Sequence, residues 1–131
     1  MKKFLPLMAA LFMVPNGGSA QDTDAGAALY DNHCAVCHGL DARGNGPLAP
    51  ALLLQPPTLV DLAKRHGQFP TARVVSRIDG RDPLVSHGSP MPIYGPFFEG
   101  SDTALKAETG QPIMTSRPIV DLVAYLRKIQ E

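Results

Sequence analysis

The 131-residue sequence has no tryptophan, only two cysteines and no excess charge, with 12 Lys and Arg against 12 Asp and Glu. Zero net charge argues against a nucleic-acid binder, because such proteins need a basic surface along the phosphates. No apolar run approaches the roughly 20 residues that span a bilayer. Apolar runs long enough for the strands of a doubly wound sheet are lacking as well.

Proline and glycine, by contrast, are abundant, with 13 and 12 residues. Such a composition predicts short helices joined by long loops, and no segment alternates long enough to indicate a strand. The expected fold class is therefore all-α. We expect helices from an Asp24 cap toward Cys34, over Leu59–His66 after Thr58, from a Thr71 cap to Gly80 and from Arg117 to Ile129, with one helical turn near Thr103–Lys106.

The first twenty residues have the pattern of a secretory signal peptide. A positive start at Lys2 and Lys3 precedes an uncharged run over residues 4–14, and Gly18 and Ala20 occupy the positions that a signal peptidase reads. We expect cleavage after Ala20, export to the periplasm and one mature domain over residues 21–131. A membrane anchor is the alternative, but the apolar run is too short for it.

Both cysteines lie in the segment Cys34-Ala35-Val36-Cys37-His38. A disulfide between them would close a very small loop and stabilise little. A thioredoxin-like dithiol expects a βαβ framework, which is not indicated here, and a zinc site needs two more ligands at a paired spacing. The remaining interpretation is covalent haem attachment, which is the assignment of C-x-x-C-H.

The geometry of this motif suits haem. Two thiols one helical turn apart can each add to a haem vinyl group, and the adjacent His38 is then brought to the iron. Bacterial attachment of this kind occurs outside the cytoplasm, which agrees with export. We therefore predict one covalent haem c, bound through Cys34 and Cys37.

At this point the chain resembles the class I c-type cytochromes over residues 24–131. The resemblance rests on a helix with Gly26 and Tyr30 before CAVCHG, the loop Gly46-Pro47-Leu48, the segment Arg77-Ile78-Asp79-Gly80-Arg81, His87-Gly88, Ser89-Pro90-Met91-Pro92 followed by Ile93-Tyr94-Gly95, and a last helix with Tyr125. It implies the cytochrome c fold, in which short helices and long loops surround the haem. It also implies that the first and last helices cross near Gly26 and Tyr125.

The second axial ligand decides between a carrier and an enzyme. Only Met91 and Met114 offer a thioether after cleavage, and the prolines on both sides of Met91 restrict its backbone. The resemblance also selects Met91. We interpret Met114 as a buried gap-filler and keep His87 as a rival ligand.

The resemblance further implies contacts around the haem. The ring of His38 should donate its other N–H to a backbone carbonyl of the Gly-Pro loop, here Pro47, with Pro50 as the alternative. Donors to the propionates are expected from the middle of the chain. The candidates there are Arg73, Arg77 and Arg81.

Ligation by His38 and Met91 would close both faces of the iron, so that it could only gain or lose an electron. The predicted function is a periplasmic one-electron carrier, not an enzyme, whose partners are redox proteins or a dehydrogenase or oxidase complex. The alternative is a haem enzyme with a labile sixth ligand, acting as a peroxidase or oxidising small sulfur or nitrogen compounds. A gas sensor would likewise need an open position on the iron.

Overall fold

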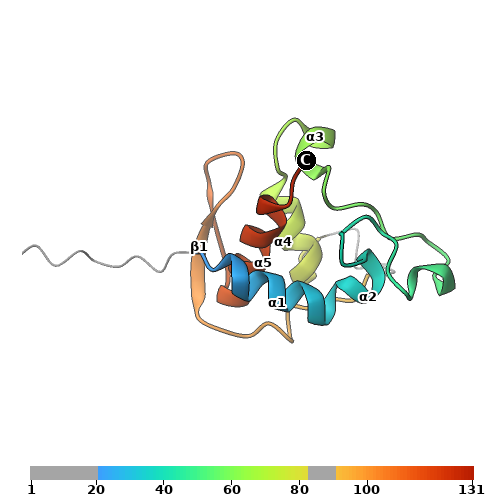
Figure 1. Cartoon of the computed structure of the whole chain (residues 1–131). Coiled ribbons are helices and arrows are strands. Elements are labelled where there is room, and N and C mark those ends of the chain that lie inside the picture. The colour runs from blue at the N-terminus through green and yellow to red at the C-terminus, as the bar shows by residue number, and fades with distance from the viewer. Residues whose placement is uncertain (1–20, 83–90) are drawn as a thin grey trace, which may run out of the picture.

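The computed structural model describes residues 21–82 and 91–131. This part of the chain is mostly helical, as expected, with short helices, long loops and one small sheet (Figure 1). In chain order the elements are α1 (Thr23–His33), α2 (Ala35–His38), the 3-10 turn η1 (Ala49–Ala51), α3 (Leu62–His66), α4 (Thr71–Asp79), β1 (Asp102–Lys106), β2 (Pro112–Ser116) and α5 (Arg117–Lys128).

The centre of the fold is the crossing of α1 and α5 (Figure 1). Gly26 lies at the crossing, where a Cβ would overlap the carbonyl oxygen of Asp121 and lie 2.9 Å from the Cβ of Tyr125. The rings of Tyr30 and Tyr125 pack together, with centroids 5.3 Å apart. The crossing that the resemblance implied is therefore present. The core around it includes Tyr30, Val75, Ile78, Phe98, Leu105, Ile119, Val120, Leu122, Val123 and Leu126.

Replacing Gly26 by alanine tests this close approach. The new methyl group would overlap the backbone of α5, which cannot move aside as a flexible side chain could, so the two helices must separate. We expect this overpacking to lower the free energy of unfolding by at least about 2 kcal/mol. Denaturant unfolding of the haem-loaded protein measures the loss. Gly100→Ala is the matched control, since its Cβ would lie 3.1 Å from Pro118 Cδ, a tight contact without overlap. Equal losses in the two variants would contradict the account of the crossing.

The start of α1 differs from the sequence prediction. Asp22, not Asp24, caps the helix, and its carboxylate accepts the backbone N–H groups of Asp24 and Ala25, both at 3.0 Å. These bonds hold the pKa of Asp22 below its ordinary value. The backbone N–H of Asp22 donates to Asp121 Oδ1 at 2.8 Å, so the buried carboxylate of α5 anchors the beginning of α1.

Two other predicted caps are wrong, although the glycines that end these helices were placed correctly. α3 begins only at Leu62, and the buried hydroxyl of Thr58 has no hydrogen-bond partner within the described residues. Thr71 is the first residue of α4 and accepts a hydrogen bond from Arg127, far away in sequence, at 2.5 Å. The left-handed backbone at Gly67 and Gly80 ends α3 and α4.

The expected helical turn near Thr103 is wrong, because this segment is strand β1. It pairs antiparallel with β2, in a register that places Thr103 opposite Thr115 and Leu105 opposite Ile113. Leu105 and Thr115 are buried against the core, and Gly110 provides the positive φ of the connecting turn. Strands of five residues are too short for their alternation to stand out in the sequence.

Candidate haem site

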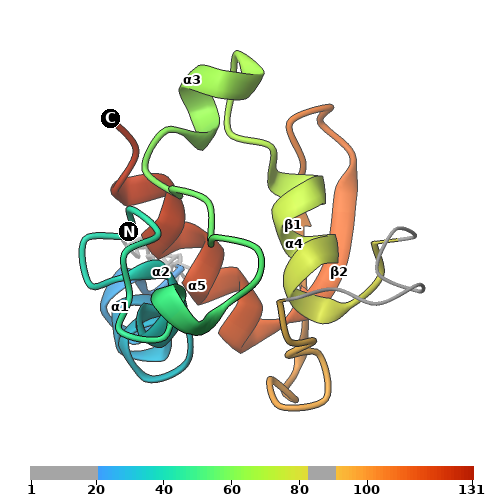
Figure 2. The ribbon, with the colours of Figure 1, turned by 90° about the vertical axis from the view of Figure 1, so that its right-hand side faces the viewer.

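A cavity of about 340 Å³ lies between the helices, within the range of roughly 300–1,000 Å³ typical of small-molecule sites. Figure 2 shows α2 and the loop after it on one side of α5, and α4 on the other. The lining is mainly apolar and is formed by Tyr30, His33, Cys34, Cys37, His38, Leu52, Leu54, Gln55, Pro56, Pro57, Leu59, Leu62, Arg65, His66, Pro70, Arg73, Val74, Arg77, Ile78, Met91, Pro92, Tyr94, Leu122 and Leu126.

Both cysteines face this cavity as free thiols. Cys34 stands at the junction of α1 and α2, and its carbonyl accepts the backbone N–H groups of Cys37 and His38 at 3.1 and 2.9 Å. Burial, with Cys37 as a smaller cause, raises the pKa of the Cys34 thiol to about 12. The sheet of the described residues has two antiparallel strands, not the βαβ framework that a thioredoxin-like dithiol expects. The described residues contain no group of three or more His, Cys, Asp or Glu that could hold a metal ion.

The imidazole of His38 is buried and oriented by a single backbone acceptor. Its Nδ1 lies 3.1 Å from the carbonyl oxygen of Pro57. A carbonyl only accepts, so Nδ1 carries the proton and the lone pair of Nε2 is left for a metal. Burial lowers the pKa of His38, while the bond to Pro57 opposes this shift. The neutral imidazole is the form that binds metals.

The acceptor is therefore Pro57, and the prediction of Pro47, with Pro50 as its alternative, is corrected. The loop around Pro47 lies along the backbone of α2, where Gly46 N–H donates to Cys37 O at 3.1 Å and Leu48 N–H to Val36 O at 2.9 Å. Ten residues after Pro47 the chain comes back to α2, where the carbonyl oxygen of Pro57 accepts the hydrogen bond from the His38 imidazole. Nothing in the local sequence marks this return, because it depends on contacts across the loop.

One of these contacts joins the two ends of the loop. The backbone N–H of Leu59 donates to Ala42 O at 2.7 Å, two residues after Pro57. Gly44 allows a second close approach, because a Cβ there would overlap the carbonyl oxygen of Pro56. The loop is thereby closed with Pro57 beside α2.

Of the two candidate thioethers, only that of Met91 faces the cavity. Met91 is half-buried there, with Pro92 beside it. Met114 is 52% exposed on β2, so its interpretation as a buried gap-filler is wrong. Met114 pairs with Ala104 of β1 in the hairpin, and both residues lie on its exposed face. His87 lies outside the described residues.

Two of the three predicted arginines line the cavity, Arg73 and Arg77. Arg77 also pairs with Asp82 at 3.1 Å. Arg81 does not line the cavity: it forms an ion pair with Asp79 and donates to the carbonyl oxygen of Met114 at 3.1 Å. Gly80 ends α4 with a left-handed residue, and the chain beyond it leaves the direction of the helix.

Sequence reasoning missed the contribution of α3 to the cavity. Leu62, Arg65 and His66 all line it. Their spacing of three and four residues places them on one helical face, which is the signal that could have identified them. Arg65 also pairs with Asp61 at 2.8 Å and donates to Thr58 O at 2.6 Å, so its guanidinium is held beside the cavity.

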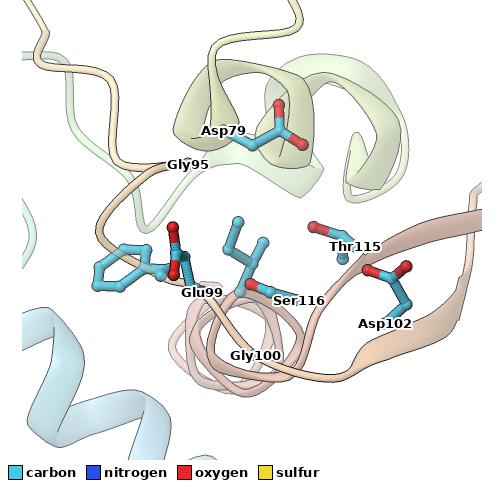
Figure 3. Close-up of a pocket in the computed structure, with 9 residues that line it drawn as sticks. Asp79, Gly95, Glu99, Gly100, Asp102, Thr115 and Ser116 are labelled. Atoms are coloured by element: carbon cyan, nitrogen blue, oxygen red, sulfur yellow. The ribbon is translucent and has the colours of Figure 1, made fainter.

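A second hollow, of about 480 Å³, lies between the end of α4 and the hairpin (Figure 3). It has a different character, because carboxylates of Asp79, Glu99 and Asp102 and a hydroxyl of Thr115 stand around it. None of the predicted site residues lines it. The haem prediction therefore concerns the cysteine-lined cavity alone.

The chain matches the family model described as Cytochrome c over residues 23–130. It therefore belongs to the cytochrome c family, whose members bind haem c covalently and are generally electron carriers. No curated protein and no solved structure matches it. Within the described residues, no helix has the length and apolar character needed to cross a membrane.

The residues present fit this group. The cavity combines an apolar wall with the two cysteines of the C-x-x-C-H spacing, and it also contains a neutral imidazole, one thioether and arginine side chains. The tautomer of His38 that Pro57 selects leaves the nitrogen that a metal requires.

Proposed function

We propose that this chain is an exported one-electron carrier with a single haem c, bound by thioethers to Cys34 and Cys37 and ligated by His38 and Met91. One observation carries the proposal. One mainly apolar cavity is lined by both cysteines, by His38 and by Met91, one of the two methionines after residue 20. The Nδ1 of His38 is hydrogen-bonded to the Pro57 carbonyl, so its Nε2 is left for a metal.

Each of these residues has a separate task. Cys34 and Cys37 hold the group in place through covalent bonds, and Pro57 fixes the plane and tautomer of His38. Met91 adds a soft sulfur donor, which favours the reduced state and raises the potential. The bound haem supplies an iron that changes between two oxidation states by one electron. Two permanent protein ligands leave no position for a substrate, which favours a carrier over a peroxidase or another haem enzyme.

The apolar wall and the arginines complete the site. Leu59, Leu122 and Leu126 line the cavity and limit the access of water. Arg73 and Arg77 offer donors for the acidic propionate groups, and charge-assisted bonds of this kind are the stronger hydrogen bonds in proteins. The two arginines would thereby neutralise the charges of the propionates.

The partners that fit this proposal are other redox proteins, or a dehydrogenase or oxidase complex in which the chain is an electron-transfer subunit. The signal-peptide pattern of the first twenty residues supports a periplasmic location.

Visible spectroscopy and potentiometry of the purified protein test the function. We expect a low-spin ferric spectrum with the sulfur-to-iron absorption band toward the red end, one reversible one-electron transition, and no binding of carbon monoxide to the reduced protein. A high-spin ferric spectrum with peroxide reactivity would instead establish the enzyme alternative.

The mass of the mature protein tests export and haem content together. We expect a chain that begins at Gln21 and carries the added mass of one haem after denaturation, because thioether bonds survive unfolding. Intact-protein mass spectrometry of the periplasmic fraction measures both values. A chain that retains residues 1–20, or one without the added mass, would contradict the proposal.

A further inference from the structure

Tyr94 lies three residues after Met91 and joins two parts of the cavity wall. Its hydroxyl donates to the carbonyl oxygen of His33 at 2.8 Å, across 61 positions in the chain. His33 is the last residue of α1 and directly precedes Cys34. This hydrogen bond therefore connects the segment that contains Met91 with the segment that contains the cysteines.

The same residue is also held from its backbone. The N–H of Tyr94 donates to Ile78 O near the end of α4 at 2.8 Å. The next residue, Gly95, packs so closely that a Cβ would lie 2.5 Å from Asp79 O. Tyr94 is thus attached to α4 by its backbone and to the end of α1 by its side chain.

Neighbouring rings keep the phenol in this orientation. The ring of Tyr94 stacks on that of Phe98, with centroids 5.5 Å apart and an interplanar angle of 17°. The imidazole of His33 meets both rings edge-on, at 5.9 and 5.2 Å. Phe98 is buried in the core, so the stack has little freedom to rotate. Burial also raises the pKa of Tyr94, which keeps its hydroxyl protonated as a donor.

We propose that Tyr94 is a positioning residue, which holds the Met91 segment against the junction of α1 and α2 and thereby keeps the Met91 sulfur on the iron. This inference rests on the proposed ligation by Met91. The two hydrogen bonds that Tyr94 donates go to the carbonyl oxygens of His33 and Ile78 and not to the proposed ligands, so its effect passes through the backbone of residues 91–94. Loss of the hydroxyl should therefore loosen the ligand without removing it.

Tyr94→Phe in the haem-loaded protein tests this role, with imidazole as an added ligand that competes with the Met91 sulfur in the oxidised state. The variant keeps the stacked ring and loses the bond to His33. We expect its apparent affinity for imidazole to rise about fivefold, which corresponds to about 1 kcal/mol for one hydrogen bond. The sulfur-to-iron band should disappear at correspondingly lower imidazole concentration.

Tyr125→Phe is the matched control. It removes the same atom from a tyrosine that packs on Tyr30 at the helix crossing and does not line the cavity. Its imidazole affinity should equal that of the wild type. Equal affinities in wild type, Tyr94→Phe and Tyr125→Phe would overturn the positioning role, and so would an equal rise in both variants, because the effect would then be one of general stability.

The wild-type spectrum separates this inference from the proposed function. If the oxidised wild type has the sulfur-to-iron band and Tyr94→Phe leaves imidazole binding unchanged, the positioning role fails and the carrier function stands. If the wild type itself lacks the band, Met91 is not a ligand, and both proposals fail together.

Discussion

Replacing Met91 by alanine should leave the haem attached to Cys34 and Cys37, lower the reduction potential and open the iron to carbon monoxide. The thioether stabilises the ferrous state, and its loss removes one of the two axial ligands. We expect the potential to fall on the order of 0.2 V, within the roughly 0.8 V through which axial ligands move haem potentials. Spectroelectrochemistry gives the potential, and carbon monoxide binding to the reduced protein reports the open position.

Met114→Ala is the control for this experiment, because the exposed side chain of Met114 lies on β2 outside the cavity. It should keep the wild-type potential and a closed iron. If Met91→Ala also keeps them, Met91 is not the ligand. If Met114→Ala produced the larger change, the placement of the two methionines would be contradicted.

Replacing Cys34 and Cys37 together by alanine should abolish covalent haem and the folded state with it. An empty cavity of about 340 Å³ would cost up to about 8 kcal/mol, at ~24 cal/mol for each Å³ that remains unfilled. That cost approaches the whole stability of a domain, roughly 5–15 kcal/mol. Acid-acetone extraction reports covalent attachment, and circular dichroism of the exported protein reports folding.

The single variants Cys34→Ala and Cys37→Ala refine this test, since each leaves one thiol on the cavity wall. Each should retain haem through one thioether and unfold at lower denaturant concentration than the wild type. Haem that resists extraction from the double variant would refute attachment through these cysteines, because the chain has no others.

Local signals in the sequence predicted part of the fold well. The ends of α3 and α4 follow from glycines that adopt a left-handed conformation, and α5 follows from a proline in its first turn and an apolar stripe. These signals act within one or two turns of chain. The starts of α1, α3 and α4 were predicted less well, since Asp22, Asp24, Thr58 and Thr71 offer similar capping groups. Distant residues act on two of them: Asp121 accepts from the backbone of Asp22, and Arg127 donates to the Thr71 hydroxyl.

The hairpin illustrates a different limit. β1 and β2 have five residues each, and only one residue of each strand is buried, Leu105 in β1 and Thr115 in β2. Their pairing buries Leu105 and Thr115 against the helices, and this burial stabilises the strands more than any preference of the segment itself. The sequence of a five-residue segment alone does not show which other elements will bury its side chains.

The sequence by itself determined the cofactor chemistry, because two thiols and an imidazole within five consecutive residues have the spacing of a haem-attachment site. It also reduced the choice of thioether to two methionines. Tertiary structure decided which methionine faces the cavity, that Pro57 rather than Pro47 accepts from His38, and that Arg81 turns away. The spacing of the motif is local and can be read from residue order, whereas the hydrogen bonds from His38 to Pro57 and from Arg81 to Met114 join residues 19 and 33 positions apart. Such bonds exist only after the loops have closed on the helices.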